Sequence, residues 1–152
     1  MLKNKYLVLI KSLKSIFDNS TPLSIQAKMS ISASMLGSNF PNWIFCGYYV
    51  VTRQHILEIG PYYGTIIPCT HIEYGKGVCG TVAERRKTII VNNVKEYDNY
   101  IACDSDTKSE IVIPVFKKNK MVAVLDIDSI KENDFEHIDR INLEKICRLI
   151  SK

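Results

Sequence analysis

EIVIPVFKKNKMVAVLDI, residues 110–127, holds two runs rich in β-branched residues, 110–116 and 121–127, around the polar segment 117–120. β-Branched runs bounded by a short polar turn are typical of two antiparallel strands. This stretch therefore predicts a hairpin near the C-terminal end of a sheet.

Two further runs extend the predicted sheet towards the N-terminus. Residues 44–52 and 55–59 flank the turn-like pair Arg53-Gln54 and predict a second hairpin. The run 88–91 predicts one more short strand. The centre of the chain is thus expected to form an antiparallel meander.

Helices are predicted at both ends of the chain. Apolar residues fall on a broad face of 2–17, as in an amphipathic helix. Thr21, followed by a proline, predicts the start of a second helix that runs to Leu36 and stops at a glycine. Asp134 is expected to cap a last helix that ends near residue 150. Terminal helices around an antiparallel sheet predict an α+β fold.

The length of 152 residues suits one domain with its own hydrophobic core. We expect that domain to span residues 1–152. Its N-terminal helices would cover about 2–36, the sheet and functional loops about 43–129, and the C-terminal helix about 134–150.

Composition and charge exclude several classes of partner. The net charge of +4 is mild, and basic residues cluster only at 85–87 and 117–120, which predicts solvated turns and no nucleic-acid partner. The apolar run 6–10 is shorter than the ~7–15 residues of a signal peptide core, and no segment predicts a membrane span. A cytoplasmic protein is expected, in which the five cysteines are thiols rather than a disulfide framework.

Three cysteines lie in or beside two long loops, 60–80 and 92–109. They are Cys69, Cys79 and Cys103, and Cys79 stands among three glycines in the segment GKGVCG. A short helix is predicted from Val78 to Arg86, and the turn at Ala102–Ser105 also resembles a helix start. A thiol that is partly exposed near a helix N-terminus has a lowered pKa, so these loop cysteines are candidate reactive thiols.

Other readings of the cysteines stay open at this stage. A zinc site with His71 as fourth ligand is disfavoured, because no two cysteines have the C-x₂₋₄-C spacing. The loop cysteines could also be ordinary structural thiols. Cys46 and Cys147 lie in a predicted strand and a predicted helix, where buried small hydrophobic residues are expected.

Carboxyl groups supply the second part of a candidate site. Asp126 and Asp128 are two residues apart in a predicted strand, so both side chains face the same side. Glu110 opens the neighbouring predicted strand. Carboxyls crowded at a pocket raise one another's pKa, so one of them is expected to stay protonated near neutral pH. A solvated pair at a strand end is the alternative.

Thiols beside a protonated acid suit the reduction of a sulfoxide. A thiolate attacks the sulfur while an acid protonates the departing oxygen. The attacking cysteine becomes a sulfenic acid, a second cysteine condenses with it to a disulfide, and an external dithiol restores both thiols.

Three segments, GTIIPCTHIEYGKGVCGTV, IACDSDTKSEIVIPV and VAVLDIDS, resemble those of the free methionine-(R)-sulfoxide reductases, which are single GAF domains. The resemblance covers about residues 44–150. It implies a GAF fold with a central antiparallel sheet and helices packed on one side, and a homodimer. It further implies free methionine-R-sulfoxide as substrate, thioredoxin as reductant, and neither a metal nor a cofactor.

The resemblance also implies roles for single residues. Cys103 occupies the catalytic position, and Cys69 and Cys79 occupy positions that form disulfides with it, with Cys69 as the chief resolving thiol. The carboxyls that would bind the sulfoxide oxygen and the substrate amino group are Glu110, Asp126 and Asp128.

One departure from the family concerns the aromatic wall of the pocket. The family has a Trp-x-Gly-Phe-Tyr segment, whereas this chain has Phe-Cys-Gly-Tyr-Tyr at 45–49, so Phe45 replaces the tryptophan. Trp43 lies two residues before Phe45 and would share its strand face if the strand extends that far. Trp43, Phe45 and Tyr49 are therefore all candidates to enclose the substrate methyl group. Backbone N–H groups at Gly77 and Val78 are expected to hold the substrate carboxylate.

Two alternative functions remain open. One is a GAF sensor that binds a small ligand, and the other is a thiol-based redox sensor, both without sulfoxide turnover.

Overall fold

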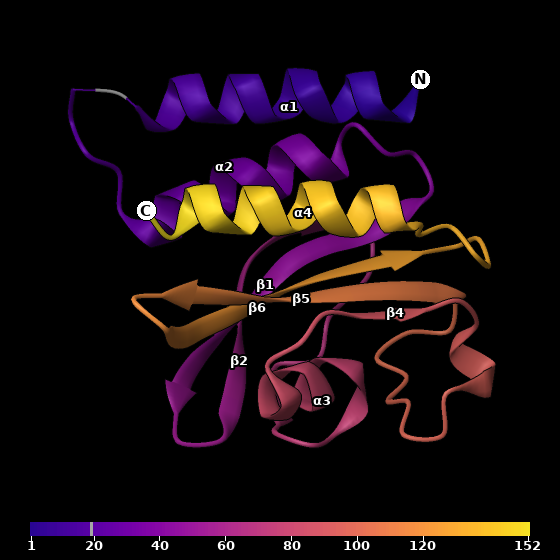
Figure 1. Ribbon diagram of the computed structural model, residues 1–152. Helices are drawn as coiled ribbons and strands as arrows, with labels where there is room; N and C mark the ends of the chain where they lie inside the picture. Colours follow the sequence, from indigo (N-terminus) through magenta and orange to yellow (C-terminus); the bar gives the residue numbers. More distant parts are fainter. Residues whose placement is uncertain (19) are drawn as a thin grey trace.

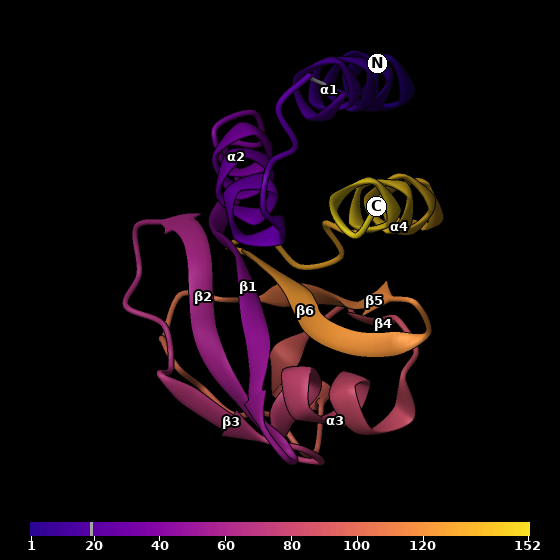
Figure 2. The ribbon, with the colours of Figure 1, turned by 90° about the vertical axis from the view of Figure 1, so that its left-hand side faces the viewer.

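A curled antiparallel sheet forms the middle of the computed structural model, which describes residues 1–18 and 20–152 (Figures 1 and 2). Its strand order is β3-β2-β1-β6-β5-β4. The strands are β1 (Trp43–Arg53), β2 (Ile56–Gly64), β3 (His71–Glu73), β4 (Ile89–Val91), β5 (Ser109–Lys117) and β6 (Lys120–Ser129).

The hairpin predicted at 110–127 is formed by β5 and β6. Lys118 and Asn119 at its tip both have positive φ, 49° and 65°, as a two-residue turn between twisted strands requires. The register places Glu110 opposite Asp128. Residues that the sequence separates by 18 positions therefore become neighbours.

The β1–β2 hairpin differs from the prediction in two details. Its turn lies at Gln54-His55, one residue later than predicted, and β2 continues to residue 64, where a loop from residue 60 was expected. Gly47 pairs with Tyr62 and Tyr49 with Ile59, so β2 carries an extra residue at this point. This bulge accommodates the Gly-Pro pair at 60–61 within the strand.

Helices α2 (Ile25–Gly37) and α4 (His137–Ile150) cover one face of the sheet, and α1 (Leu2–Phe17) packs on these two helices, on the side away from the sheet (Figures 1 and 2). This arrangement confirms the predicted α+β fold with terminal helices on one side. The start of α2 was predicted wrongly at Thr21. The Ser24 hydroxyl accepts a hydrogen bond from the N–H of Ala27 at 3.1 Å, and this N-cap sets the start at Ile25.

The N-cap of α4 also differs from the prediction. Glu136 occupies the position in a capping box with Asp139. Asp134 instead accepts a hydrogen bond from the Ser129 hydroxyl at 2.7 Å and one from the Asn42 side chain at 3.4 Å. Its carboxylate therefore secures the end of β6 rather than the helix.

The opposite face carries α3 (Gly77–Arg85), the 3-10 turn η1 (Val94–Glu96) and the long loops (Figure 1). Helix α3 agrees with the short helix predicted at 78–86, and Arg86 follows it in the left-handed conformation. The helix start suggested at 102–105 is absent from the described chain. There the Asp104 carboxylate accepts hydrogen bonds from the N–H groups of Asp106 and Thr107 and holds a turn.

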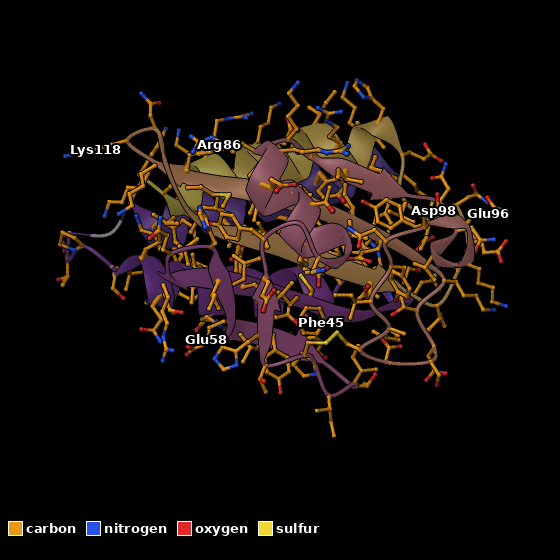
Figure 3. The ribbon with its side chains drawn as sticks, turned by 90° about the horizontal axis from the view of Figure 1, so that it is seen from below. Phe45, Glu58, Arg86, Glu96, Asp98 and Lys118 are labelled. Carbon is orange, nitrogen blue, oxygen red and sulfur yellow. A yellow bond between two sulfur atoms is a disulfide. The ribbon has the colours of Figure 1, made fainter. Side chains whose placement is uncertain are left out.

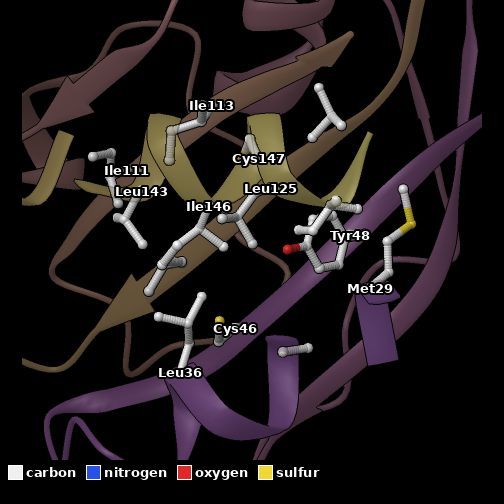
Figure 4. Close-up of a cluster of buried hydrophobic side chains, with 14 of the residues drawn as sticks. Met29, Leu36, Cys46, Tyr48, Ile111, Ile113, Leu125, Leu143, Ile146 and Cys147 are labelled. Atoms are coloured by element: carbon white, nitrogen blue, oxygen red, sulfur yellow. The ribbon is translucent and has the colours of Figure 1, made fainter. Parts of the chain in front are cut away.

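Two hydrophobic clusters lie on the two faces of the sheet. The helix-side core contains Cys46 and Cys147, which are buried as predicted (Figure 4). In the same layer the Tyr6 hydroxyl donates a 2.7 Å hydrogen bond to Asp139, which ties α1 to α4. The second cluster, here called the pocket-side core, packs α3 against β1, β5 and β6. None of the described helices is long and apolar enough to cross a membrane.

Candidate active site

A pocket of about 430 Å³, open space at its mouth included, lies on the α3 side of the sheet. Strands β1, β5 and β6 form its floor, the start of α3 forms one wall, and the two cysteine loops form its rim. Most of the predicted site residues line it, namely Phe45, Tyr49, Gly77, Val78, Cys79, Cys103, Glu110, Asp126 and Asp128.

A disulfide joins Cys69 to Cys103 at this rim, with a Cα–Cα distance of 5.4 Å. The two residues are 34 positions apart in the sequence, and both are half-buried. Figure 3 shows the bond beside Phe45, on the face that carries α3. The fold thus links the two loops that the sequence singled out.

The three carboxyls meet on the pocket floor. Glu110, Asp126 and Asp128 are 5%, 6% and 8% exposed, so the alternative of a solvated strand-end pair is wrong. Burial raises the pKa of Asp126 to about 7. Burial, and then the charge of Asp126, raise the pKa values of Glu110 and Asp128 well above their usual range. Protonated carboxyls near neutral pH agree with the expectation.

One oxygen of the cluster needs an outside partner. Among the buried side-chain nitrogen and oxygen atoms of residues 1–18 and 20–152, Oδ1 of Asp126 alone has no hydrogen-bond partner. A buried polar atom in this condition is costly unless a bound molecule or water satisfies it. The floor of the pocket therefore favours a ligand that brings a donor or acceptor to Asp126.

Cys79 does not match the expectation of a partly exposed, low-pKa thiol. It lies in the first turn of α3 but is only 4% exposed. Burial, followed by the charges of Asp126 and Glu110, raises the pKa of its thiol well above the usual value. Desolvation and three nearby carboxyls outweigh the helix N-terminus, so Cys79 is a neutral thiol at neutral pH.

Among residues 1–18 and 20–152, one group of side chains has the donor atoms for a metal site. Cys79 Sγ and one carboxylate oxygen each of Glu110 and Asp126 lie within 4.8 Å of one another. The zinc set with His71 is not assembled. His71 is exposed and its Nε2 lies 3.3 Å from a Glu58 oxygen, while Cys69 and Cys103 are joined to each other.

The glycines of 75–80 shape the wall of the pocket. Gly77 has a φ of +61°, which an L side chain adopts only with strain. Gly80 has no room for a Cβ, which would overlap the carbonyl oxygen of Glu73. These glycines bring the start of α3 to the pocket, where the first N–H groups have no acceptor within the helix.

The aromatic candidates separate onto the two faces of the sheet. Phe45 and Tyr49 line the pocket, whereas Trp43 does not. Trp43 pairs with Ser129 and Phe45 with Asp128, so β1 has an extra residue between them. This bulge turns Trp43 to the helix-side core, where its ring stacks on Phe40 at 3.8 Å. The expectation that residues 43 and 45 share one face is wrong.

Sequence reasoning missed the residues that hold the Cys103 loop over the pocket. Asn99 Nδ2 donates to the Gly75 carbonyl at 2.8 Å and to the Thr81 hydroxyl at 3.2 Å. Tyr100 and Ile101 then line the pocket. The only signal in the sequence was the length of the loop that contains them.

The fold and the family model define the class. A GAF-domain family model matches residues 36–152, so the chain is a GAF domain. Free methionine-R-sulfoxide reductase of Saccharomyces cerevisiae is 43% identical over 114 residues, which cover 73% of this chain and 62% of that protein. The enzyme of the same name from Escherichia coli is 33% identical over 129 residues, 85% of this chain and 77% of the relative.

A solved structure that resembles this chain points to the same family as these relatives. The structure of fRMsr of Staphylococcus aureus in its reduced form has a TM-score of 0.89 at 36% identity and covers 96% of this chain and 92% of that one. Within the GAF domains, the chain belongs to the family of the free methionine-R-sulfoxide reductases, as the sequence resemblance predicted. It spans about three fifths of the yeast relative's length.

Proposed function

We propose that this protein reduces free methionine-R-sulfoxide to methionine, with Cys103 as the attacking thiol. The observation that carries the proposal is the Cys69–Cys103 disulfide at the rim of a pocket whose floor holds three buried carboxyls. A sulfoxide reductase needs a nucleophile, a resolving thiol and a proton donor around one cavity. The relatives with this name support the choice of substrate.

The pocket offers a partner for each group of a free amino acid sulfoxide. The N–H groups of Gly77 and Val78, at the start of α3, suit the substrate carboxylate. The carboxyl cluster suits the amino group and the sulfoxide oxygen, and Asp126 Oδ1 would gain its missing partner. The rings of Phe45 and Tyr49 suit the methyl–sulfur end, since a sulfur–ring contact contributes about 0.3–1.5 kcal/mol.

The chemical step transfers one oxygen atom. The Cys103 thiolate attacks the sulfoxide sulfur, and a protonated carboxyl of the floor gives its proton to the sulfoxide oxygen. The hydroxyl then moves from the methionine sulfur to the Cys103 sulfur while the sulfur–sulfur bond breaks, which leaves methionine and the sulfenic acid of Cys103. With a pKa of about 7, Asp126 can lose and regain a proton near neutral pH, as an acid used in every turnover must.

Regeneration takes two further steps. The Cys69 thiol displaces water from the sulfenic acid and forms the disulfide. A dithiol protein of the thioredoxin class then supplies two electrons and two protons and leaves both cysteines reduced. Cys69 is preferred over Cys79 as resolving thiol, because Cys79 is more deeply buried and its thiol is held neutral.

The thiols supply the electrons, so the proposal needs no metal or cofactor. We further expect a homodimer that acts in the cytoplasm. Leu7 and Val8, which are 57% and 65% exposed on α1, give the helix layer an apolar surface suited to self-association. Sedimentation equilibrium tests the dimer.

Intact mass after a single turnover tests the reaction. Fully reduced protein is mixed with methionine-R-sulfoxide in the absence of reductant. A loss of two hydrogens with one methionine released per chain is expected. Cys103→Ser should show neither change, whereas Cys69→Ser should still release one methionine and then stop at the sulfenic acid.

The same experiment separates the alternatives. A GAF sensor would bind the sulfoxide without methionine release. A redox sensor would lose two hydrogens with peroxide but not with the sulfoxide. The S epimer serves as the negative control, and methionine release from wild type that persists in Cys103→Ser would contradict the assignment of the nucleophile.

A further inference from the structure

An exposed apolar side chain precedes each cysteine of the disulfide in the sequence. Ile67 is 87% exposed and stands two residues before Cys69, and Ile101 is 42% exposed and stands two residues before Cys103. Single exposed hydrophobic residues are common on protein surfaces. Here, however, each of the two loops joined by the disulfide carries an exposed isoleucine, although the two cysteines are 34 residues apart in the sequence.

We propose that Ile67, Pro68 and Ile101, here called the apolar collar, form the docking surface for the protein dithiol that reduces the disulfide; this rests on the proposed catalytic cycle. The occupant is a protein whose attacking thiol is bordered by apolar surface. Pro68 and Ile101 also line the pocket, so the collar is continuous with the site that the substrate leaves.

The chemistry of exchange requires contact at this place. The attacking thiolate forms a mixed disulfide with Cys69 or Cys103, and the other cysteine leaves as a thiolate that takes up a proton. The partner's second thiol then breaks the mixed disulfide, so the partner is oxidised and both cysteines are reduced. Both cysteines are half-buried, so part of each lies below the surface. A protein whose thiolate reaches either sulfur must therefore also contact the residues around it.

The acidic residue that follows Cys103 in the sequence has other partners. Asp104 Oδ2 accepts a 2.7 Å hydrogen bond from the Thr107 hydroxyl, and Oδ1 accepts two more from backbone N–H groups. Its carboxylate is therefore occupied within its own turn. Recognition at the collar is expected to come from apolar burial, to which Ile67 has the most exposed area to contribute.

Ile67→Ser tests the proposal, because Ile67 does not line the pocket. Wild type and variant are oxidised with peroxide, and the second-order rate constant for reduction by thioredoxin is measured, a step that needs no sulfoxide. The variant should react about tenfold more slowly, an effect of about 1.4 kcal/mol. Reduction by dithiothreitol, which is too small to need a docking surface, should keep its wild-type rate.

Ile16→Ser, at a 39% exposed position on α1, is the matched control and should leave both rates unchanged. An unchanged thioredoxin rate in Ile67→Ser, or an equal fall with both reductants, would overturn the proposal. So would a wild-type disulfide that dithiothreitol reduces and thioredoxin does not. Failure of the proposed function would show separately, as the absence of methionine release in the single-turnover assay with unchanged reduction rates.

Discussion

Replacement of Asp126 by asparagine is expected to stabilise the fold while it impairs turnover. The carboxyl is 6% exposed, lies beside Glu110 and Asp128, and has one oxygen without a hydrogen-bond partner. Ionisation in that place is unfavourable, which is why the pKa in the folded chain is raised. Asparagine keeps the size of the side chain and cannot ionise.

The size of the stability penalty follows from the pKa of Asp126. Folding raises it from 3.8 to about 7, and each unit corresponds to 1.36 kcal/mol. Below about pH 4 both states hold the proton and stability carries no penalty. Between about pH 4 and 7 the unfolded chain ionises while the folded chain stays protonated, so the free energy of unfolding falls by about 1.4 kcal/mol per pH unit. Above pH 7 a penalty of about 4 kcal/mol remains.

Urea unfolding of wild type and Asp126→Asn at pH 5, 6.5 and 8 measures this penalty. The stability advantage of the variant should grow with pH towards about 4 kcal/mol, while its methionine release falls. Asp98→Asn, at an exposed position, should match wild type throughout. A variant that is less stable than wild type at pH 8, or a difference that does not change with pH, would show that folding does not raise the pKa of Asp126 and would refute the reasoning.

Three further predictions concern the walls of the pocket. Gly77→Val forces a β-branched residue to a φ of +61° and should lower stability by about 1–2 kcal/mol but turnover more than tenfold, as urea unfolding and initial rates can show; an equal fall would make the glycine structural only. Trp43→Ala should cost about 3–5 kcal/mol of stability with little change in KM, whereas Phe45→Leu should raise KM at small cost in stability. Asn99→Ala removes two hydrogen bonds of the Cys103 loop and should lower kcat/KM with wild-type thermal unfolding.

The strands were the most predictable part of the fold. The hairpin at 110–127 could be located because β-branched runs and a polar turn follow from local sequence alone. The N-caps Ser24 and Glu136 could not be separated from the competing caps Thr21 and Asp134. The choice depends on what else each side chain can reach, such as the Ser129 hydroxyl for Asp134.

The site was predictable in its chemistry and less so in its environment. Spacing by two placed Asp126 and Asp128 on one face, and the register with Glu110 completed the cluster. The burial of Cys79 and the turning of Trp43 could not be inferred, because both depend on tertiary packing. A single extra residue in β1 reverses the alternation on which the sequence argument for Trp43 relied.

The hydrogen bond between Tyr6 and Asp139 spans 133 residues and has a consequence for the order of folding. Helix α1 precedes the sheet in the chain, whereas α4, against which it packs together with α2, follows the sheet. The sheet and the pocket consist of residues between α1 and α4 and can assemble before the docking surface of α1 is complete. Attachment of α1 is therefore expected to be a late event in biogenesis, and a chain released early would expose the helix-side core rather than the face that carries the pocket.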